Sequence, residues 1–170
     1  MQKPEYFQTL SHYNQWMNER IYNACDRIPD NQRKENRGAF FGSIHGTLNH
    51  LLLADKLWLG RFYNQPFPVR SLDQELYANF DSLREERQST DRQIQAWVDS
   101  LTEEQLAAPF AFHSHSQDRT CRFPLWHVAL HFFNHQTHHR GQLTTLLTQW
   151  GCHPGVTDLL WLPAAELTSE

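Results

Sequence analysis

Hydrophobic side chains near the start of the chain recur at alternating spacings of three and four residues. The series includes one polar member, Asn14, and its apolar members are Phe7, Leu10, Met17, Ile21, Ala24 and Ile28. This spacing is typical of a helix with one face against a core. We therefore expect a first helix from about Pro4, since proline suits a first helical turn, to Ile28. Turn-forming and charged residues at positions 29–38 predict a loop.

The same spacing predicts a second helix that begins between Gly38 and Ser43 and ends near Phe62. The residues on its pattern are Ile44, Leu48, Leu51, Asp55, Trp58 and Phe62. Between Ala39 and Ala54 the chain has no Asp, Glu, Lys or Arg. A helix without charges over that length is buried on several faces or against a second subunit. Because one bundle core cannot cover so much non-polar circumference, we expect a homodimer.

The second half of the chain begins with a crossover, indicated by two prolines in residues 64–73. After it, spacings of three and four residues predict a third long helix over about residues 76–101. Thr102 and Gln105 form a capping-box pattern that starts a short helical piece. Residues 109–123 alternate imperfectly between apolar and polar, which indicates a small hairpin or an ordered loop.

The last long helix is expected to begin at Pro124 and to end before Gly151, since proline is favoured at a first helical position and glycine just after a last one. Four long helices, with a long crossover between the second and the third, predict an all-α fold of the four-helix-bundle type. The chain of 170 residues has no internal repeat, low-complexity segment or linker. We therefore expect a single domain over residues 1–170.

Histidines are concentrated in the last predicted helix, which holds five of the 11: His127, His131, His135, His138 and His139. At about 100° per residue, His139 lies about 40° from His135, on the side that carries the apolar residues. Two imidazoles one turn apart can bind one ion. Because the HxxxH spacing occurs three times in succession, we expect a metal site with His135 and His139 as ligands. The roles of the other three histidines stay open.

A metal ion needs at least one more protein ligand, and in a bundle another helix has to supply it. The candidates from the residues alone are His50, His45, His12 and Asp55, which the pattern does not separate. His50 lies off the main apolar stripe and shares a face with small residues such as Gly46, a surface that lets a neighbouring helix approach closely.

Polar residues around the ligands are expected to orient them or to bind a coordinated water. Gln142 lies about 20° from His135 around the helix, and Asn14 is the polar position in the stripe of the first helix. The residue after His135 is Gln136, where zinc proteases with the HExxH motif have a glutamate base. Peptide hydrolysis is therefore disfavoured, although three imidazoles leave a position open on an ion.

The charge of the chain argues against one class of partner. There are 15 Lys and Arg against 19 Asp and Glu, a formal net charge of −4, and no run of basic residues. We expect no nucleic-acid partner, because neutralisation of phosphates dominates such binding. Neither a signal peptide nor an apolar run of membrane-spanning length is present, so we expect no membrane partner. The scattered cysteines Cys25, Cys121 and Cys152 are typical of a reducing compartment, and a cytoplasmic location is expected.

Two segments resemble the signature stretches of the DinB/YfiT-like metalloprotein superfamily: SIHGTLNHLLLADKLWL at 43–59 and HFFNHQTHHRGQL at 131–143. NQWMNER at 14–20 is similar to the first helix of that superfamily. The resemblance implies a four-helix bundle with a three-histidine site and, for many members, a dimer. The matching ligand positions are His50, His135 and His139. The implied cofactor is one divalent ion, zinc or nickel, with iron or manganese as alternatives.

Characterised relatives in that superfamily include thiol-dependent transferases and an isomerase, while its name records induction by DNA damage. The resemblance therefore favours a metal-dependent enzyme that activates a small-molecule thiol for attack on an electrophile. The alternatives are a non-catalytic metal-binding or stress-response module and a metal-dependent hydrolase that acts on another small substrate. Imidazole suits zinc, nickel, copper and iron alike, so the residues alone do not name the metal.

Overall fold

The computed structural model describes residues 3–114 and 117–163 of the chain. Its elements are α1 (Pro4–Cys25), α2 (Asp30–Arg33), α3 (Ile44–Phe62), α4 (Phe80–Asp99), α5 (Glu103–Ala107), β1 (Pro109–Ser114), β2 (Arg119–Pro124), α6 (Leu125–Thr148) and the 3-10 helix η1 (Leu159–Trp161). The prediction of a mostly helical chain is confirmed, with the addition of one small sheet. The assignment of residues 1–170 to one domain stays a prediction, and it includes residues 164–170, which lie outside the described part.

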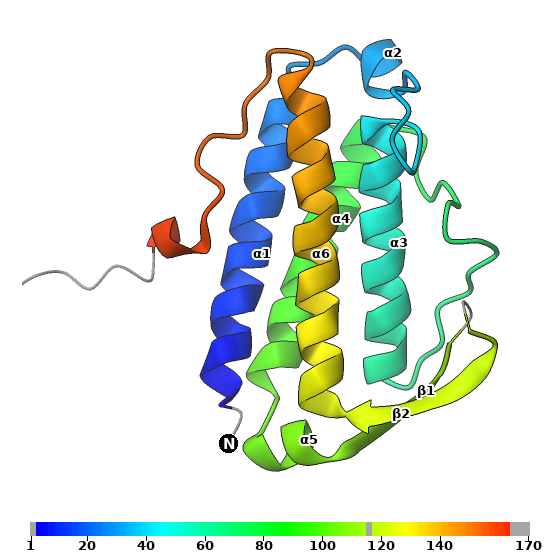
Figure 1. The fold of residues 1–170 in the computed structure, drawn as a ribbon, viewed down its shortest axis with the longest axis vertical. Helices are drawn as coiled ribbons and strands as arrows, with labels where there is room; N and C mark the ends of the chain where they lie inside the picture. Colours follow the sequence, from blue (N-terminus) through cyan, green and yellow to red (C-terminus); the bar gives the residue numbers. More distant parts are fainter. Residues whose placement is uncertain (1–2, 115–116, 164–170) are drawn as a thin grey trace, which may run out of the picture.

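Four long helices lie side by side (Figure 1). Helix α1 packs against α4 and α6, and α3 packs against the same two helices. Helices α1 and α6 run in one direction, and α3 and α4 run in the other (Figure 1). Because α3 and α4 share a direction, the chain between them has to return along the length of the helices. Residues 63–79 form this crossover beside α3, where two prolines predicted it.

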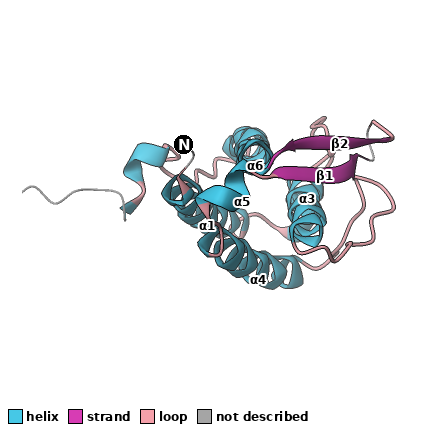
Figure 2. Ribbon diagram, turned by 90° about the horizontal axis from the view of Figure 1, so that it is seen from below, coloured by secondary structure: helices cyan, strands magenta, loops and turns pink. Residues whose placement is uncertain are grey.

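The strands β1 and β2 form a hairpin between α5 and α6 at one end of the helices (Figure 2). They pair antiparallel, with Phe112 opposite Cys121. The backbone N–H of Leu125 donates to the carbonyl of Ala108 at 2.9 Å, which joins the start of α6 to the end of α5. Of the two structures expected for this segment, the hairpin is the one that forms. Residues 115–116 of the segment lie outside the described part.

Some helices begin or end at residues other than those that the periodicity predicts. At the start of α4 the reason is a side chain that bonds the backbone. The backbone N–H groups of Leu76 and Tyr77 donate to the Asn49 side chain at 2.8 and 2.9 Å, so these residues are held outside a helix. Helix α4 therefore begins later than expected, with Asn79 as its cap. Helix α1 ends at Cys25, before the expected residue, and α2 lies in the segment predicted as a loop. The capping box predicted for the short helix α5 is present.

The apolar core consists of two clusters at opposite ends of the long helices. The cluster near the end of α1 includes Met17, Ile21, Leu48, Leu52, Leu83 and Leu147. The cluster near the hairpin includes Phe7, Trp58, Ile94, Trp97 and Phe132. In the second cluster the rings of Phe62 and Trp97 stack with their centres 3.9 Å apart. Between the two clusters, buried polar side chains face one another.

These polar side chains form a network that joins all four long helices. Arg87 on α4 donates to Asp55 on α3 at 2.6 Å, and its other amino group lies 2.8 Å from Asp91. Asn18 on α1 donates to Asp91 at 2.9 Å, and Gln136 on α6 donates to Asp55. All five side chains are buried. Burial raises the pKa of Asp55 to about 6, an effect that the neighbouring Arg87 opposes.

The crossover packs against α3, whose residues 44–54 include no Asp, Glu, Lys or Arg. The Nε2 atom of His45 lies 2.8 Å from the carbonyl oxygen of Tyr77, and the Asn49 amide donates to the same oxygen at 3.1 Å. Gly60 allows a close approach, since a Cβ there would lie 2.7 Å from the Gln65 carbonyl oxygen. The non-polar surface around α3, which led us to expect a second subunit, is thus buried within one chain. Although α3 is apolar, no helix in the described ranges is long and apolar enough to cross a membrane.

Replacing Arg87 with methionine removes the cation that both Asp55 and Asp91 contact. We expect the free energy of unfolding to fall by about 3–5 kcal/mol, because two carboxylates stay buried without that partner. Urea unfolding at neutral pH, followed by circular dichroism, measures the loss. The control is Lys34→Met, which removes an exposed pair with Asp30 and should cost less than about 1 kcal/mol. Equally small losses in both variants would contradict a stabilising role for the network.

Candidate metal centre

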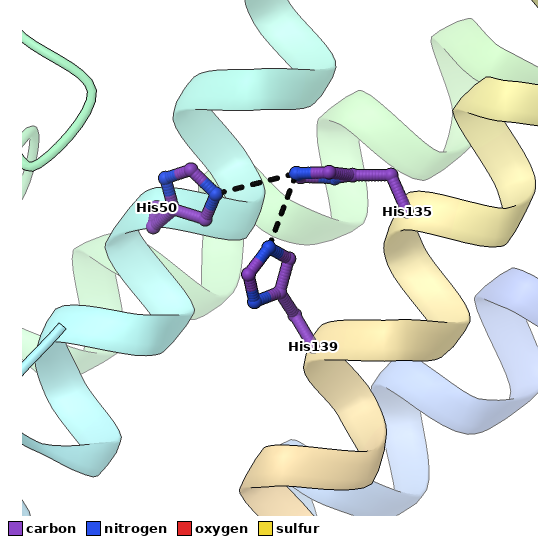
Figure 3. Close-up of side chains that lie close together, drawn as sticks. All are labelled: His50, His135 and His139. Atoms are coloured by element: carbon purple, nitrogen blue, oxygen red, sulfur yellow. Dashed lines mark hydrogen bonds between the residues drawn. The ribbon is translucent and has the colours of Figure 1, made fainter. Parts of the chain in front are cut away.

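Three imidazole rings meet between α3 and α6 (Figure 3). His135 and His139 lie one turn apart on α6, and His50 reaches them from α3. The Nε2 atom of His135 is 3.4 Å from that of His50 and 3.1 Å from that of His139. One ligand atom from each of the three lies within 4.8 Å of the other two. The structure thus brings together the residues at the three positions that the resemblance implied.

Phe41, in the segment before α3, covers one side of this three-histidine cluster. Its ring stacks on His50 with the ring centres 3.7 Å apart, and it meets His139 edge-on at 5.5 Å. The approach depends on Gly46, where a Cβ would lie 2.2 Å from the Phe41 carbonyl oxygen. The glycine therefore allows the backbone of a loop to pack closely against α3. The sequence had suggested that a neighbouring helix packs there. Ser43 caps α3 by accepting from the Gly46 N–H at 3.0 Å.

Hydrogen bonds fix the orientation of two of the three rings. The Nδ1 atom of His50 lies 2.7 Å from the carbonyl oxygen of Leu72 in the crossover, and Nδ1 of His139 lies 2.8 Å from Oε1 of Gln142. Both oxygens are acceptors, so Nδ1 carries the proton and Nε2 keeps its lone pair. Metal-binding histidines are oriented by bonds of this kind. No sequence pattern pointed to Leu72, because a backbone carbonyl carries no signal of residue type.

Burial keeps the three rings neutral. It lowers the pKa of His135 to about 3, and the nearby His139 and His50 lower it as well. Burial lowers the pKa of His50 to about 4, although the hydrogen bond with Leu72 opposes this shift. The pKa of His139 also falls below its ordinary value through burial, against the hydrogen bond with Gln142. At neutral pH all three rings can therefore offer a lone pair to a cation.

The contacts among the three Nε2 atoms suit a divalent ion. A neutral His135 carries at most one proton on Nε2, and that proton can point at only one of its two neighbours. Nitrogens bound at about 2.05 Å to a tetrahedral zinc ion lie about 3.3 Å apart, close to the separations of 3.1 and 3.4 Å. Imidazole is a good ligand for zinc and for nickel. Three protein ligands leave at least one position for a small molecule.

A cavity of about 400 Å³ lies beside the cluster, between α3, α6 and the hairpin. His50 and His135 line it on the side of the cluster. The rest of its lining is mostly apolar and aromatic, and includes Leu57, Trp58, Arg61, Phe112, Phe123 and His131. A molecule in this cavity therefore lies against two of the three histidines.

The other candidates for the third ligand lie elsewhere. His45 bonds the Tyr77 carbonyl of the crossover. His12 is exposed on α1. Asp55 is bonded to Arg87 within the buried network. The choice among these residues therefore depends on the packing of α3 against its neighbours, which periodicity alone does not describe.

Of the two polar residues expected around the ligands, the structure places Gln142 against the cluster and Asn14 in the buried network. Arg140 donates to the Asn14 side chain, whose amide lies 3.4 Å from Asp91. His138 is exposed, with its Nε2 3.3 Å from the Gln142 amide nitrogen. Asn14 therefore helps to join the helices, and Gln142 helps to orient His139.

All three cysteines are free thiols. Burial raises the pKa of Cys25 to about 12, so this thiol stays protonated at neutral pH. Cys121 lies in β2 and Cys152 follows α6, and both are partly exposed. None of the three belongs to the histidine cluster.

The fold and the site define a helical protein with a cluster of three neutral imidazoles, two of which line a mostly apolar cavity. The model of the DinB family matches residues 1–170 of the chain. A relative, Protein DinB of Bacillus subtilis (strain 168), is 26% identical over 159 residues, which cover 88% of this chain and 88% of the relative. The chain belongs to the DinB family, and the resemblance seen in its two histidine-containing segments is confirmed.

We expect the protein, purified without a histidine tag, to carry one divalent ion per chain. Changing His50, His135 or His139 to alanine should remove the ion, because two imidazoles hold it far more weakly than three. Elemental analysis after desalting measures the metal content. His138→Ala is the matched control, since it removes an exposed histidine from the same helix and should leave the metal in place. Full metal content in two of the three ligand variants would rule out this cluster as the site.

Proposed function

We propose that this DinB-family protein is a four-helix bundle that holds one divalent ion, zinc or nickel, at His50, His135 and His139. We further propose that it is a metal-dependent enzyme acting on a small thiol. The proposal is carried by the meeting of three Nε2 atoms from His50, His135 and His139, two of which belong to residues that line a mostly apolar cavity. Structural zinc sites have four protein ligands, whereas catalytic sites keep one position open. Three histidines next to a cavity favour the second kind.

The residues of the chain fix the positions of the three histidines and form the cavity beside them. The rigid helix α6 sets the spacing of His135 and His139, and the Leu72 carbonyl orients His50. Phe41 covers one side of the cluster and does not line the cavity. A small molecule in the cavity would therefore approach the cluster from a side that Phe41 leaves uncovered. Fixed ligands beside an apolar chamber favour the binding of a small molecule in one orientation.

A divalent ion held by His50, His135 and His139 would supply Lewis acidity and would favour the thiolate form of a thiol substrate at neutral pH. The overall transfer would form a bond between the sulfur and an electrophilic carbon of the second substrate. It would break the bond from that carbon to its leaving group, which would take up the proton that the thiol releases. No cysteine of the chain has to act as the nucleophile, since the buried Cys25 stays protonated and the substrate provides the sulfur.

Two other functions are alternatives: a non-catalytic metal-binding or stress-response module, and a metal-dependent hydrolase. Hydrolysis requires a base near the open position. Gln136, which follows His135, donates its amide to the buried Asp55. No Asp or Glu lines the cavity within the described residues. The name of the Bacillus relative, Protein DinB, states no reaction, so the support for thiol chemistry comes from the site and from the resemblance.

Cobalt-substituted protein should bind small thiols through sulfur. We expect 2-mercaptoethanol and glutathione to produce a sulfur-to-metal charge-transfer band in the near ultraviolet, because the metal ion favours the thiolate form. Ethylene glycol, which has no sulfur, should produce none, and His135→Ala should show no band with any of them. If no thiol changes the spectrum at millimolar concentration, the transferase proposal is wrong and the binding module is preferred.

The homodimer stays a proposal, although α3 is covered within one chain. Large apolar side chains do remain exposed, among them Leu160 at 76% and Trp161 at 59%, and such side chains are available for contact with a second copy. Light scattering at tens of micromolar should give about twice the chain mass of 20.1 kDa. A stable particle of 20.1 kDa under these conditions would contradict the dimer.

We propose neither nucleic acid nor a membrane as a partner. The formal charge of −4 supplies no attraction for phosphates. A cytoplasmic location is also proposed, and the three free thiols favour it.

A further inference from the structure

Arg61 lines the cavity away from the three-histidine cluster. It follows His50 by eleven residues on α3, which corresponds to about 16 Å along the helix axis. On α6, His127 and His135 both line the cavity and lie about 12 Å apart along the axis. The cavity therefore extends along the groove between α3 and α6, with the cluster at one end and Arg61 and His127 at the other.

The guanidinium of Arg61 is held by two aromatic rings and one backbone carbonyl. Its central carbon lies 4.5 Å from the ring centre of Trp58 and 4.9 Å from that of Phe112. Its Nη2 donates to the carbonyl of His113 at 2.9 Å. A guanidinium has five N–H donors, so this single hydrogen bond leaves donors for a ligand. The contacts fix the position of the charge without neutralising it.

No carboxylate compensates the charge of Arg61 in the part of the chain that the structure describes. Burial lowers the pKa of Arg61, and the group that opposes this effect is the Cys121 thiol. The described lining of the cavity has cationic or neutral titratable groups, namely Arg61 and several histidines, and no Asp or Glu. A partly buried cation without a partner is unfavourable. An anionic group on a ligand would supply the missing charge.

Between its two ends the cavity is mostly apolar, with His131 as the polar residue from α6. Leu57 and Trp58 line it from α3, Val128 from α6, and Phe112 and Phe123 from the hairpin. The edge of the His131 ring meets Trp58 at 5.5 Å between ring centres. Aromatic and aliphatic walls favour an apolar group in the middle of a bound molecule.

We propose that this cavity binds an elongated molecule with an apolar middle and a carboxylate, and that Arg61 binds the carboxylate at the end away from the three-histidine cluster. The reactive end of the same molecule faces the cluster, and in this respect the inference rests on the proposed function. Arg61 determines specificity and takes no part in the chemistry. A carboxylate accepts two N–H bonds from a guanidinium in one plane, which gives such a pair both strength and orientation.

Two probes that differ in one group test the proposal: 4-phenylbutyrate, which has a carboxylate, and 4-phenyl-1-butanol, which has a hydroxyl group in its place. Titration calorimetry with the zinc-loaded protein measures the ratio of their dissociation constants. We expect the carboxylate to bind at least about tenfold more tightly, a typical effect of a charge-assisted hydrogen bond. Equal affinity for the two probes, or no binding of either at millimolar concentration, would overturn the proposal.

Variants assign that preference to a residue. Arg61→Gln should reduce the ratio to about one, and Arg61→Lys should keep part of it, because a charge is retained. Arg92→Gln removes an exposed arginine of α4 and should keep the full ratio. A purely structural role of Arg61, through its contacts with Trp58 and Phe112, would weaken both probes equally and leave the ratio unchanged. An unchanged ratio in Arg61→Gln therefore overturns the proposal.

A carboxylate can also bind a metal ion directly, and His135→Ala separates that case. If Arg61 holds the carboxylate, the ratio persists in His135→Ala, where a metal ligand is missing. If the ratio is lost there and kept in Arg61→Gln, the carboxylate lies at the cluster and the proposal is wrong. The failure of the proposed function has a different signature, since the thiol band of the cobalt protein is then absent while the preference for the carboxylate remains.

Discussion

A buried hydrogen bond between the Gln136 amide on α6 and the Asp55 carboxylate on α3 fixes the height at which these two helices face each other. Gln136 directly follows His135 along the chain, and Asp55 lies little more than one turn after His50. A sliding of α3 along α6 by one turn, about 5.4 Å, would break this bond and would also separate the Nε2 atoms that now lie 3.4 Å apart. The geometry of the histidine cluster thus depends on the buried polar network next to it.

Burial of the polar network costs free energy, because two carboxylates and two guanidinium groups leave water. Its members compensate one another: Arg87 lies between Asp55 and Asp91, and Arg140 donates to Asn14. Replacing a buried ionic network with apolar side chains of similar volume often leaves a fold as stable or more stable, so stability alone does not account for these residues. We therefore interpret the network as the interaction that selects one alignment of the four helices. The cluster requires that single alignment.

Periodicity predicted the long helices and placed His135 and His139 together on the core side of α6, because one turn separates them on a single rigid element. It did not single out His50, whose partners are on another helix and in the crossover, and the family resemblance implied that position. Asp55 stood among the apolar positions of its stripe, so its pairing with Arg87 was not foreseen. Phe41 and the Leu72 carbonyl come from segments without periodicity, where position depends on tertiary contacts alone.

The three-histidine cluster and the far part of the cavity are formed by different residues. The Leu72 carbonyl and Gln142 orient two of the three imidazoles, and Phe41 covers a side of the cluster that does not face the cavity. The far part of the cavity is formed by the last turns of α3, the first turns of α6 and the hairpin. The residues there have no contact with the ligand nitrogens, so their side chains can differ without changing the geometry of the cluster. Changes in the hairpin and the neighbouring helix ends would thus alter the shape of the cavity and leave the positions of the three histidines as they are.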